Sequence, residues 1–226
     1  MSGPGPRAEP RDGGDECADR RYAPLVDRES PADLPPPPAD AEGSVLDWLT
    51  RAGASRDVID GVRPIATSWE ELYRECKRGD WLLGIAARAG VPLPLLVRAA
   101  VGSARTAMTY VQAPEAERVL AAAAAFADGG PVEAVRDATA DLDDKLGGAR
   151  DPAEDAALRA VMAVGLGVDD PGTLASAPAA AAEATIVAVM DCAWSTAQRY
   201  AHATTANAVR EAIPWADVAP LFAALR

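Results

Sequence analysis

Apolar residues recur at helical spacing through most of the chain beyond residue 43. In the segment SWEELYREC, for example, Leu72, Tyr73 and Cys76 follow Trp69 by three, four and seven residues. This spacing places the four side chains on one face of an α-helix, and no run of alternating β-branched residues is long enough to predict a strand. The sequence therefore predicts an all-α domain over residues 44–226.

Serines mark the starts of the first predicted helices. Ser44 and Ser55 each precede a short segment with helical periodicity, and Pro64 is expected to stop the second helix. Ser68 and Glu71 form the S-x-x-E pattern of a capping box, in which the serine hydroxyl accepts a backbone N–H and the glutamate reaches back to the serine N–H. We therefore expect helices to begin directly after all three serines.

The segment CKRGDWLLG lies between two predicted helices. We expect Gly79 to end the first helix and Asp80 to cap the second by accepting backbone N–H bonds. This start places Trp81, Leu82 and Ile85 on the buried face of the second helix, with Trp81 anchored in the core. The Arg-Gly-Asp tripeptide is thus interpreted as the boundary between two helices. An integrin-type adhesion motif is the alternative, but the N-terminal sequence lacks the pattern of a secretion signal.

Alanine-rich helices separated by proline and glycine are predicted for the rest of the domain. The expected helices cover residues 92–111, 114–128, 131–146, 152–166, 178–213 and 214–222. Residues 178–213 form either two helices or one helix of about 54 Å. The stripe expected to be buried along this segment comprises Ile186, Val189, Met190, Ala193, Trp194, Ala197, Tyr200 and Ala201.

Helices rich in alanine must approach one another closely, because alanine favours helix formation but buries little area. Gly102 and Ser103, on or near the apolar stripe of their helix, are predicted to permit such an approach. No fixed period relates the helical segments. The sequence therefore favours a compact multi-helix bundle over a solenoid, which the helix–proline–helix rhythm leaves open.

The first 43 residues differ from the rest in composition. They hold nine of the nineteen prolines, ten acidic and five basic side chains, and almost no aliphatic periodicity. Such a segment cannot bury enough apolar surface to offset its conformational entropy, so it is predicted to be a disordered tail. The prolines at 35–38 are expected to form a polyproline II segment, either as a spacer or as a ligand for an aromatic groove.

The charge of the chain restricts its partners. The formal net charge is −12, which argues against binding to nucleic acid or to an anionic membrane, because both attract basic surfaces. A basic protein partner suits the chain better. Its three cysteines, Cys17, Cys76 and Cys192, are too few and too widely separated for a disulfide framework. We therefore expect free thiols and a cytoplasmic location.

The sequence contains no recognisable catalytic constellation. His202 is the only histidine, which excludes a two-histidine metal site, and it lies about 15 Å from Cys192 along one predicted helix. The chain is therefore predicted not to be an enzyme and to bind no cofactor or metal. The DLDD segment at 141–144 is similar to the acidic motif of terpene cyclases, so an enzyme acting on a prenyl diphosphate is kept as a remote alternative. The 5% aromatic content argues against the aromatic-lined cavity that such an enzyme needs.

Acidic side chains are most concentrated between residues 137 and 155, which we call the acidic segment. Its members are Asp137, Asp141, Asp143, Asp144, Asp151, Glu154 and Asp155. Such a cluster is either a solvated surface or a docking face for a basic partner. As a docking face, it would accelerate association with a partner of opposite charge.

Three segments of the chain resemble the fifth class of bacterial immunity proteins named in polymorphic-toxin systems. They are CKRGDWLLGIAARAGV, LLVRAAVGSARTAMTYV and EAERVLAAAAAFADG, with matching positions at Cys76, Arg78, Gly79, Asp80, Trp81, Leu82, Leu83, Ala99, Ala100, Ala104, Arg105 and Gly129. The ending AVREAIPW also resembles the family, so the resemblance covers residues 68–215. The chain departs from the family at Gly84, where a tryptophan is expected, and at Gly102 and Ser103, where cysteines are expected.

The resemblance implies a non-catalytic protein that binds and blocks a cognate toxin, which could be basic. The residues at 76–83 that match the family motif, together with Arg105, are interpreted as structural. A helical protein-interaction module with a disordered regulatory arm is the second hypothesis. The prenyl diphosphate enzyme is the third.

Overall fold

Helices are the only regular secondary structure in the described part of the chain. The computed structural model describes residues 44–143, 151–189 and 194–225, so the predicted disordered tail at 1–43 lies outside the described residues. Eleven α-helices and three short 3-10 helices account for the regular structure of these ranges. The all-α prediction is confirmed. Among these helices, none combines the length and apolar character that a membrane span requires.

The first helices begin where the serines predict. They are α1 (Val45–Arg51), α2 (Arg56–Val62), the 3-10 helix η3 (Arg63–Ile65) and α3 (Trp69–Glu75). The hydroxyls of Ser44, Ser55 and Ser68 each accept a backbone N–H from the first turn of the following helix. Only this half of the capping box forms at Ser68, because the Glu71 carboxylate accepts a hydrogen bond from the Thr67 hydroxyl instead.

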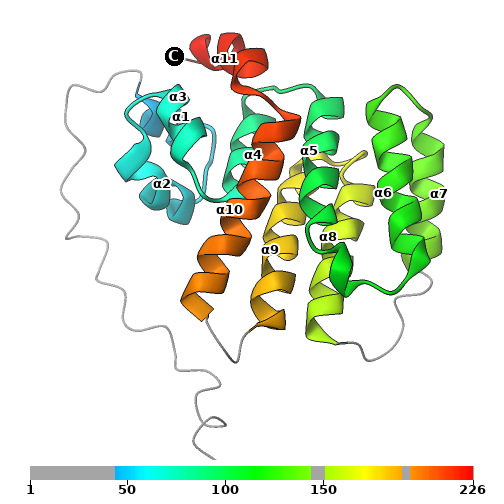
Figure 1. The fold of residues 1–226 in the computed structure, drawn as a ribbon. Coiled ribbons are helices and arrows are strands. Elements are labelled where there is room, and N and C mark those ends of the chain that lie inside the picture. The colour runs from blue at the N-terminus through cyan, green and yellow to red at the C-terminus, as the bar shows by residue number, and fades with distance from the viewer. Residues whose placement is uncertain (1–43, 144–150, 190–193, 226) are drawn as a thin grey trace, which may run out of the picture. The chain divides into compact units, whose positions relative to one another are not determined.

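The remaining elements form the larger part of the bundle (Figure 1). They are α4 (Gly79–Arg88), α5 (Leu93–Arg105), η4 (Met108–Tyr110), α6 (Pro114–Ala127), α7 (Val132–Asp143), α8 (Pro152–Leu166), η5 (Pro171–Ala175), α9 (Ser176–Ala188), α10 (Trp194–Ala212) and α11 (Trp215–Ala223). Glycine ends α4 and α6 as expected. Gly90 and Gly129 follow them at φ of 81° and 96°, values in the left-handed region that glycine adopts without strain.

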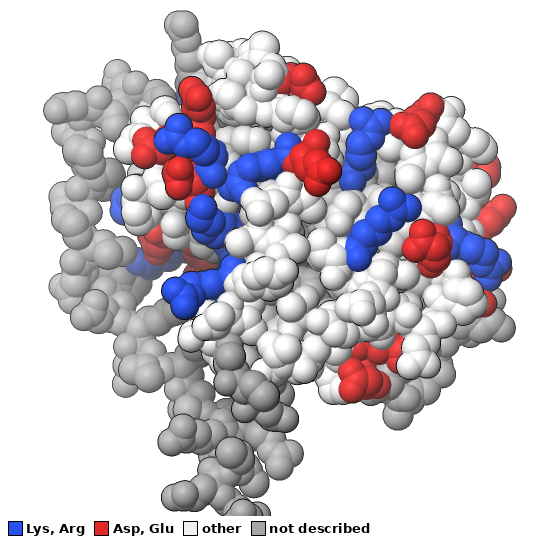
Figure 2. Space-filling view, in the orientation of Figure 1, with Lys and Arg blue, Asp and Glu red and all other residues white. Residues whose placement is uncertain are grey.

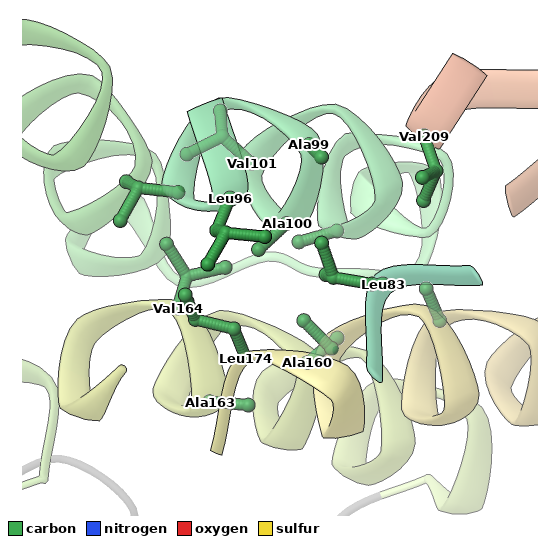
Figure 3. Close-up of a cluster of buried hydrophobic side chains, with 14 of the residues drawn as sticks. Leu83, Leu96, Ala99, Ala100, Val101, Ala160, Ala163, Val164, Leu174 and Val209 are labelled. Atoms are coloured by element: carbon green, nitrogen blue, oxygen red, sulfur yellow. The ribbon is translucent and has the colours of Figure 1, made fainter. Parts of the chain in front are cut away.

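Helix α5 lies at the centre of the bundle. It contacts α4, α6, α8, α9 and α10, and α10 returns to contact α4 and α5 near the middle of the domain. In a solenoid each repeat contacts only its neighbours in the sequence, so these contacts identify a bundle. Figure 3 shows the core around α5, where Leu83 of α4 and Val164 of α8 lie near Leu96 and Ala100, and Val209 of α10 lies at the far end of the cluster.

Aromatic side chains hold α11 against α1 and α3. The ring centroids of Trp69 and Phe222 lie 5.0 Å apart, and Trp48 meets Trp69 edge-on at 5.2 Å. Tyr73 lies 5.5 Å from Trp215, and its hydroxyl donates a hydrogen bond to a backbone carbonyl at the end of α10. Much of the small aromatic content of the chain is therefore used in one core cluster.

One helix prediction is corrected by the structure, because the helix predicted for 92–111 ends at Arg105. For residues 178–213 the sequence left open one helix of about 54 Å or two helices, and the structure has the two helices α9 and α10. The predicted stripe is also only partly buried. Ile186, Ala197 and Ala201 are buried, whereas Val189, Trp194 and Tyr200 are exposed; Met190 and Ala193 lie outside the described residues.

Candidate functional site

The motif residues at 76–83 connect α3 to α4. Helix α4 begins at Gly79, so this glycine does not end α3, which stops at Glu75. Asp80 does not cap α4 either: its carboxylate accepts two hydrogen bonds from the Arg78 guanidinium, at 2.8 and 2.6 Å. A two-point ion pair to a guanidinium two residues away competes with capping, and the capping prediction is wrong for this reason.

Trp81 lies at the edge of the core rather than inside it. The Arg78 guanidinium stacks over its ring, 4.6 Å from the ring centroid, and the ring packs on Gly61. A Cβ atom at Gly61 would lie 2.0 Å from the Trp81 ring, so this glycine leaves the space that the indole occupies. Trp81 also lines a cavity of about 400 Å³ together with Asp80 and Arg88. Trp81, which the sequence predicts as a core anchor, is thus partly buried and packs against the core from its edge.

Gly79 lies at a close contact between α4 and α10. A Cβ atom at this position would lie 2.7 Å from the Thr205 carbonyl carbon and 2.9 Å from the backbone nitrogen of Ala206. Backbone cannot yield at these distances, so any side chain here would separate the two helices. This tight contact is one that the sequence does not predict, while a Cβ atom at Gly102, where a close approach is expected, would meet Ala208 of α10 at ordinary van der Waals distance. Ser103 is buried and donates its hydroxyl to the Ala99 carbonyl.

The remaining motif residues of α3 and α4 are also structural. Leu82 and Leu83 are buried in the core, and Cys76 is a buried free thiol whose pKa is raised by burial. Arg210 of α10 donates hydrogen bonds to the backbone carbonyls of Tyr73 and Cys76 at the end of α3. A high pKa suppresses the thiolate, so this cysteine is not suited to nucleophilic chemistry.

His202 faces the Arg78–Asp80 pair from α10. Its Nδ1 atom is buried and has no hydrogen-bond partner among the described residues. Burial lowers the pKa of His202, the Arg78 charge lowers it further, and the Asp80 charge partly opposes them. The imidazole is therefore held neutral near pH 7. Cys192 lies outside the described residues.

Most of the acidic segment is engaged within the fold. Asp141 pairs with Arg118 of α6 at 3.1 Å, and Asp155 pairs with Arg159 at 3.3 Å. The Asp151 carboxylate caps α8 by accepting the N–H groups of Ala153 and Glu154. The Glu154 carboxylate in turn accepts the backbone N–H of Gln112 at 3.3 Å.

The other members of the acidic segment differ from these. Asp137 and Asp143 are exposed and make no ion pair with the part of the chain that the structure describes, and Asp144 lies outside it. Asp143 lines a cavity of about 410 Å³ beside the exposed Leu166 and the ion pair between Arg136 and Asp169. Among the described residues, Asp137 and Asp143 are the members of the acidic segment that remain available to a partner, and a docking role for the segment stays a prediction.

A groove of about 710 Å³, which we call the α5 groove, lies between α10 and α6 with α5 as its floor. The lining residues are Arg98, Val101, Gly102, Arg105, Thr106, Ala124, Asp128, Tyr200, Thr204, Asn207, Ala208, Glu211 and Ala212. On α10 they include positions 200, 204, 207, 208 and 211, which share one face of the helix. Figure 2 shows that a broad area without charged side chains occupies the middle of this side of the molecule, with charged side chains at its margins.

Tyr200 is the most exposed large apolar side chain at the groove. Its exposed fraction is 67%, and that of Trp194, earlier on α10, is 51%. The sequence assigned both to a buried stripe, so the groove was missed. Arg105 differs from the other motif residues because it also lines the groove, where it pairs with Glu117 at 3.5 Å. The spacing of Arg98, Gly102 and Arg105 on one face of α5 was the signal that could have indicated a surface here.

The described residues contain no cluster of three or more histidine, cysteine, aspartate or glutamate side chains that could hold a metal ion. Comparison with protein-family models, with curated proteins and with solved structures gives no match. The family resemblance noted in the sequence therefore stays a prediction.

Proposed function

We propose that the chain is a non-catalytic protein-binding module of the immunity type, which binds a cognate toxin and blocks it. The observation that supports protein binding is the exposure of Tyr200 at the rim of the α5 groove. Tyrosine and tryptophan are enriched at protein interfaces, where each buries a large area at a small cost in conformational entropy. Partner binding would remove this surface from water.

The exposure of Tyr200 and Trp194 differs from the use of aromatic residues elsewhere in the domain. Trp48, Trp69 and Trp215 lie in the cluster that joins α1, α3 and α11. Burying an exposed aromatic side chain contributes about 1.5 to 3 kcal/mol, so two of them on α10 represent a sizeable part of a binding free energy. Because both side chains are exposed, most of this free energy does not contribute to the stability of the bundle.

The toxin-blocking part of the proposal rests on the sequence resemblance at residues 68–215. The same exposed face of α10 supports an interaction module with no toxin partner, which is the second candidate function. A cytoplasmic location is part of the proposal and rests on the expectation of free thiols, of which Cys76 is one. The prenyl diphosphate hypothesis gains no support, because Asp141 of its DLDD motif pairs with Arg118 on the surface.

Affinity capture with the full chain from its native host tests the proposal. We expect one protein to be recovered in stoichiometric amount, to stop growth when it is expressed alone, and to be harmless when it is co-expressed with this chain. Tyr200→Ala should weaken capture at an unchanged melting temperature. Leu166→Ala is the matched control, because Leu166 is a large exposed side chain on α8, away from α10.

Each outcome of this experiment bears on the proposal. A partner that is captured but has no effect on growth would favour the interaction module. Absence of any stoichiometric partner would contradict protein binding. If Leu166→Ala weakened capture and Tyr200→Ala did not, the contact would lie at α8 rather than α10.

A further inference from the structure

We propose that the α5 groove binds an amphipathic α-helix of the partner that carries two carboxylates seven residues apart. This inference rests on the proposed function only in that the partner is a protein. It identifies the chemistry of the segment that the partner inserts. Helix-in-groove binding of this kind uses residues at i, i+3, i+4 and i+7 as its contacts.

The floor of the groove has the spacing that such a helix would match. Arg98, Val101, Gly102 and Arg105 stand at i, i+3, i+4 and i+7 of α5 and all line the groove. The two arginines are therefore on one face of α5, about 10.5 Å apart along its axis. Between them the floor holds only a valine and a glycine, which can accommodate apolar side chains of the incoming helix.

Gly102 leaves depth in the groove that core packing does not need. A Cβ atom at Gly102 would lie 3.8 Å from the Ala208 Cβ, which is an ordinary van der Waals contact. Glycine costs a helix interior about 1 kcal/mol relative to alanine. At Gly79 that cost is required by the contact with α10, whereas at Gly102 the fold shows no such requirement. The space is therefore available to a ligand.

Charge indicates which kind of helix fits. The charged side chains that line the groove are Arg98 and Arg105 on α5, with Asp128 after α6 and Glu211 on α10 at the walls. Arg210 is turned toward the end of α3, so Arg98 and Arg105 are the arginines that line the groove. A guanidinium binds a carboxylate through two parallel hydrogen bonds, which gives geometric specificity as well as attraction.

The two arginines are already paired, but by partners that are easily replaced. Arg98 pairs with Asp128 at 2.7 Å and Arg105 with Glu117 at 3.5 Å, and all four side chains are about half exposed or more. Ion pairs of this exposure contribute little to stability. Carboxylates of a docked helix would meet the same arginines with less water around them. Asp128 and Glu211 also line the groove, so a docked helix gains from carboxylates only where they meet the two arginines, and carboxylates elsewhere on its inner face would be repelled.

Two stapled helical peptides provide the test. Both carry leucine at i+3 and alanine at i+4, with the staple on the opposite face; one has glutamate at i and i+7, and the other has glutamine there. Binding to the full chain is measured by fluorescence anisotropy at low and high salt. We expect the glutamate peptide to bind roughly ten-fold more tightly at low salt, and the difference to shrink at high salt.

Variants of the chain locate the contact. Arg98→Gln with Arg105→Gln should remove the preference for glutamate, and Gly102→Leu should weaken both peptides because it fills the groove. Arg118→Gln with Arg136→Gln is the matched control, since these exposed arginines are also ion-paired but lie outside the groove. Melting temperatures show whether each variant is folded. Equal binding of the two peptides, no binding of either, or an equal loss in the control variant would overturn the proposal.

The captured partner separates this inference from the proposed function. If the partner binds the Arg98→Gln, Arg105→Gln variant as tightly as the parent chain, the groove proposal fails while protein binding stands. If no protein is captured but the glutamate peptide binds through the two arginines, the groove proposal stands and the proposed function fails.

Discussion

The two sides of α10 use glycine in opposite ways. On the side of α4, Gly79 brings the helices into backbone contact, and Arg78, Asp80 and His202 fill the space beside it. On the side of α6, a groove of about 710 Å³ opens over α5, and a Cβ atom added to Gly102 on its floor would lie 3.8 Å from Ala208. We call the α4 side of α10, where the helices are in contact at Gly79, the closed side. The α6 side, which holds the α5 groove, is the open side.

This difference distinguishes a surface that core packing fills from one that it leaves open. A residue type that core packing requires cannot be assigned to a partner, because the fold alone accounts for it. Core packing on the closed side requires Gly79 in this way, so the fold alone explains this residue. The open side has an exposed tyrosine, two arginines and a glycine that the bundle does not need.

Substitution of Gly79 should produce the largest effect. In Gly79→Ala the new Cβ would lie 2.7 Å from the Thr205 backbone, so α4 and α10 must separate. We expect the free energy of unfolding to fall by about 3 kcal/mol, as for other overpacked cores. Urea denaturation measures it. Gly84→Ala in the same helix is the control: its nearest neighbour at 3.3 Å is the movable end of Arg88, so its change should stay within about 1 kcal/mol.

Alkaline pH should lower the free energy of unfolding through Tyr73, whose hydroxyl lies against the end of α10. Burial raises the pKa of Tyr73 to about 12, while the Arg210 charge opposes this rise. Below pH 10 the hydroxyl is protonated in both states; between pH 10 and 12 only the unfolded state loses its proton, so stability falls as pH rises. The loss is about 2.7 kcal/mol for a two-unit difference in pKa.

The variant Tyr73→Phe isolates this contribution. It lacks the titrating hydroxyl, so its free energy of unfolding should change less over pH 10 to 12 than that of the parent chain. Titration of the other tyrosines is common to both proteins and cancels in the difference. Parallel pH profiles would show that Tyr73 is not buried against the end of α10.

Removal of the Asp80 charge should change both stability and the titration of His202. In Asp80→Asn the two-point ion pair with Arg78 is lost, at a cost of about 1 kcal/mol because the pair is only partly buried. The charge that raises the pKa of His202 is lost too, while Arg78 continues to lower it. We therefore expect a lower His202 pKa by NMR titration. An unchanged pKa would place the imidazole away from this pair.

Burial of His202, helped by the Arg78 charge, sets the sign of the acid response. The pKa of His202 is lower in the folded state than the ordinary value, so acidification through about pH 6.5 protonates the unfolded chain first. Stability is therefore present above this pH and is lost as pH falls. His202→Gln should reduce this loss.

Helix starts were predictable from the sequence because their causes are local. Ser44, Ser55 and Ser68 cap helices through hydrogen bonds that span three residues or fewer. The failed cap at Asp80 has a local cause as well: Arg78 stands two residues away and takes the carboxylate. Sequence patterns do not decide between two such partners, since the outcome depends on where Trp81 and α10 hold the arginine.

The surfaces were not predictable, because their causes are distant in the sequence. Asp141 is paired with an arginine 23 residues away and Glu154 with a backbone N–H 42 residues away, so the acidic segment seemed freer than it is. Alanine occupies most faces of α9 and α10, and periodicity alone therefore did not show that Tyr200 faces outward. Only the positions of α5 and α6 determine that.

The smallest expected effect is the one that best distinguishes the open side from the closed side. Gly102→Ala adds a Cβ that meets Ala208 at 3.8 Å without overlap, and alanine is the better residue inside a helix. The free energy of unfolding should therefore rise by about 0.5 to 1 kcal/mol, opposite in sign to Gly79→Ala. The added methyl group also makes the groove shallower, so binding of the glutamate peptide should weaken by a few-fold. Ala208→Gly on the facing wall is the reverse control, with lower stability and no loss of binding. Destabilisation by Gly102→Ala would reveal a tight helix contact at this position and close the groove to any ligand.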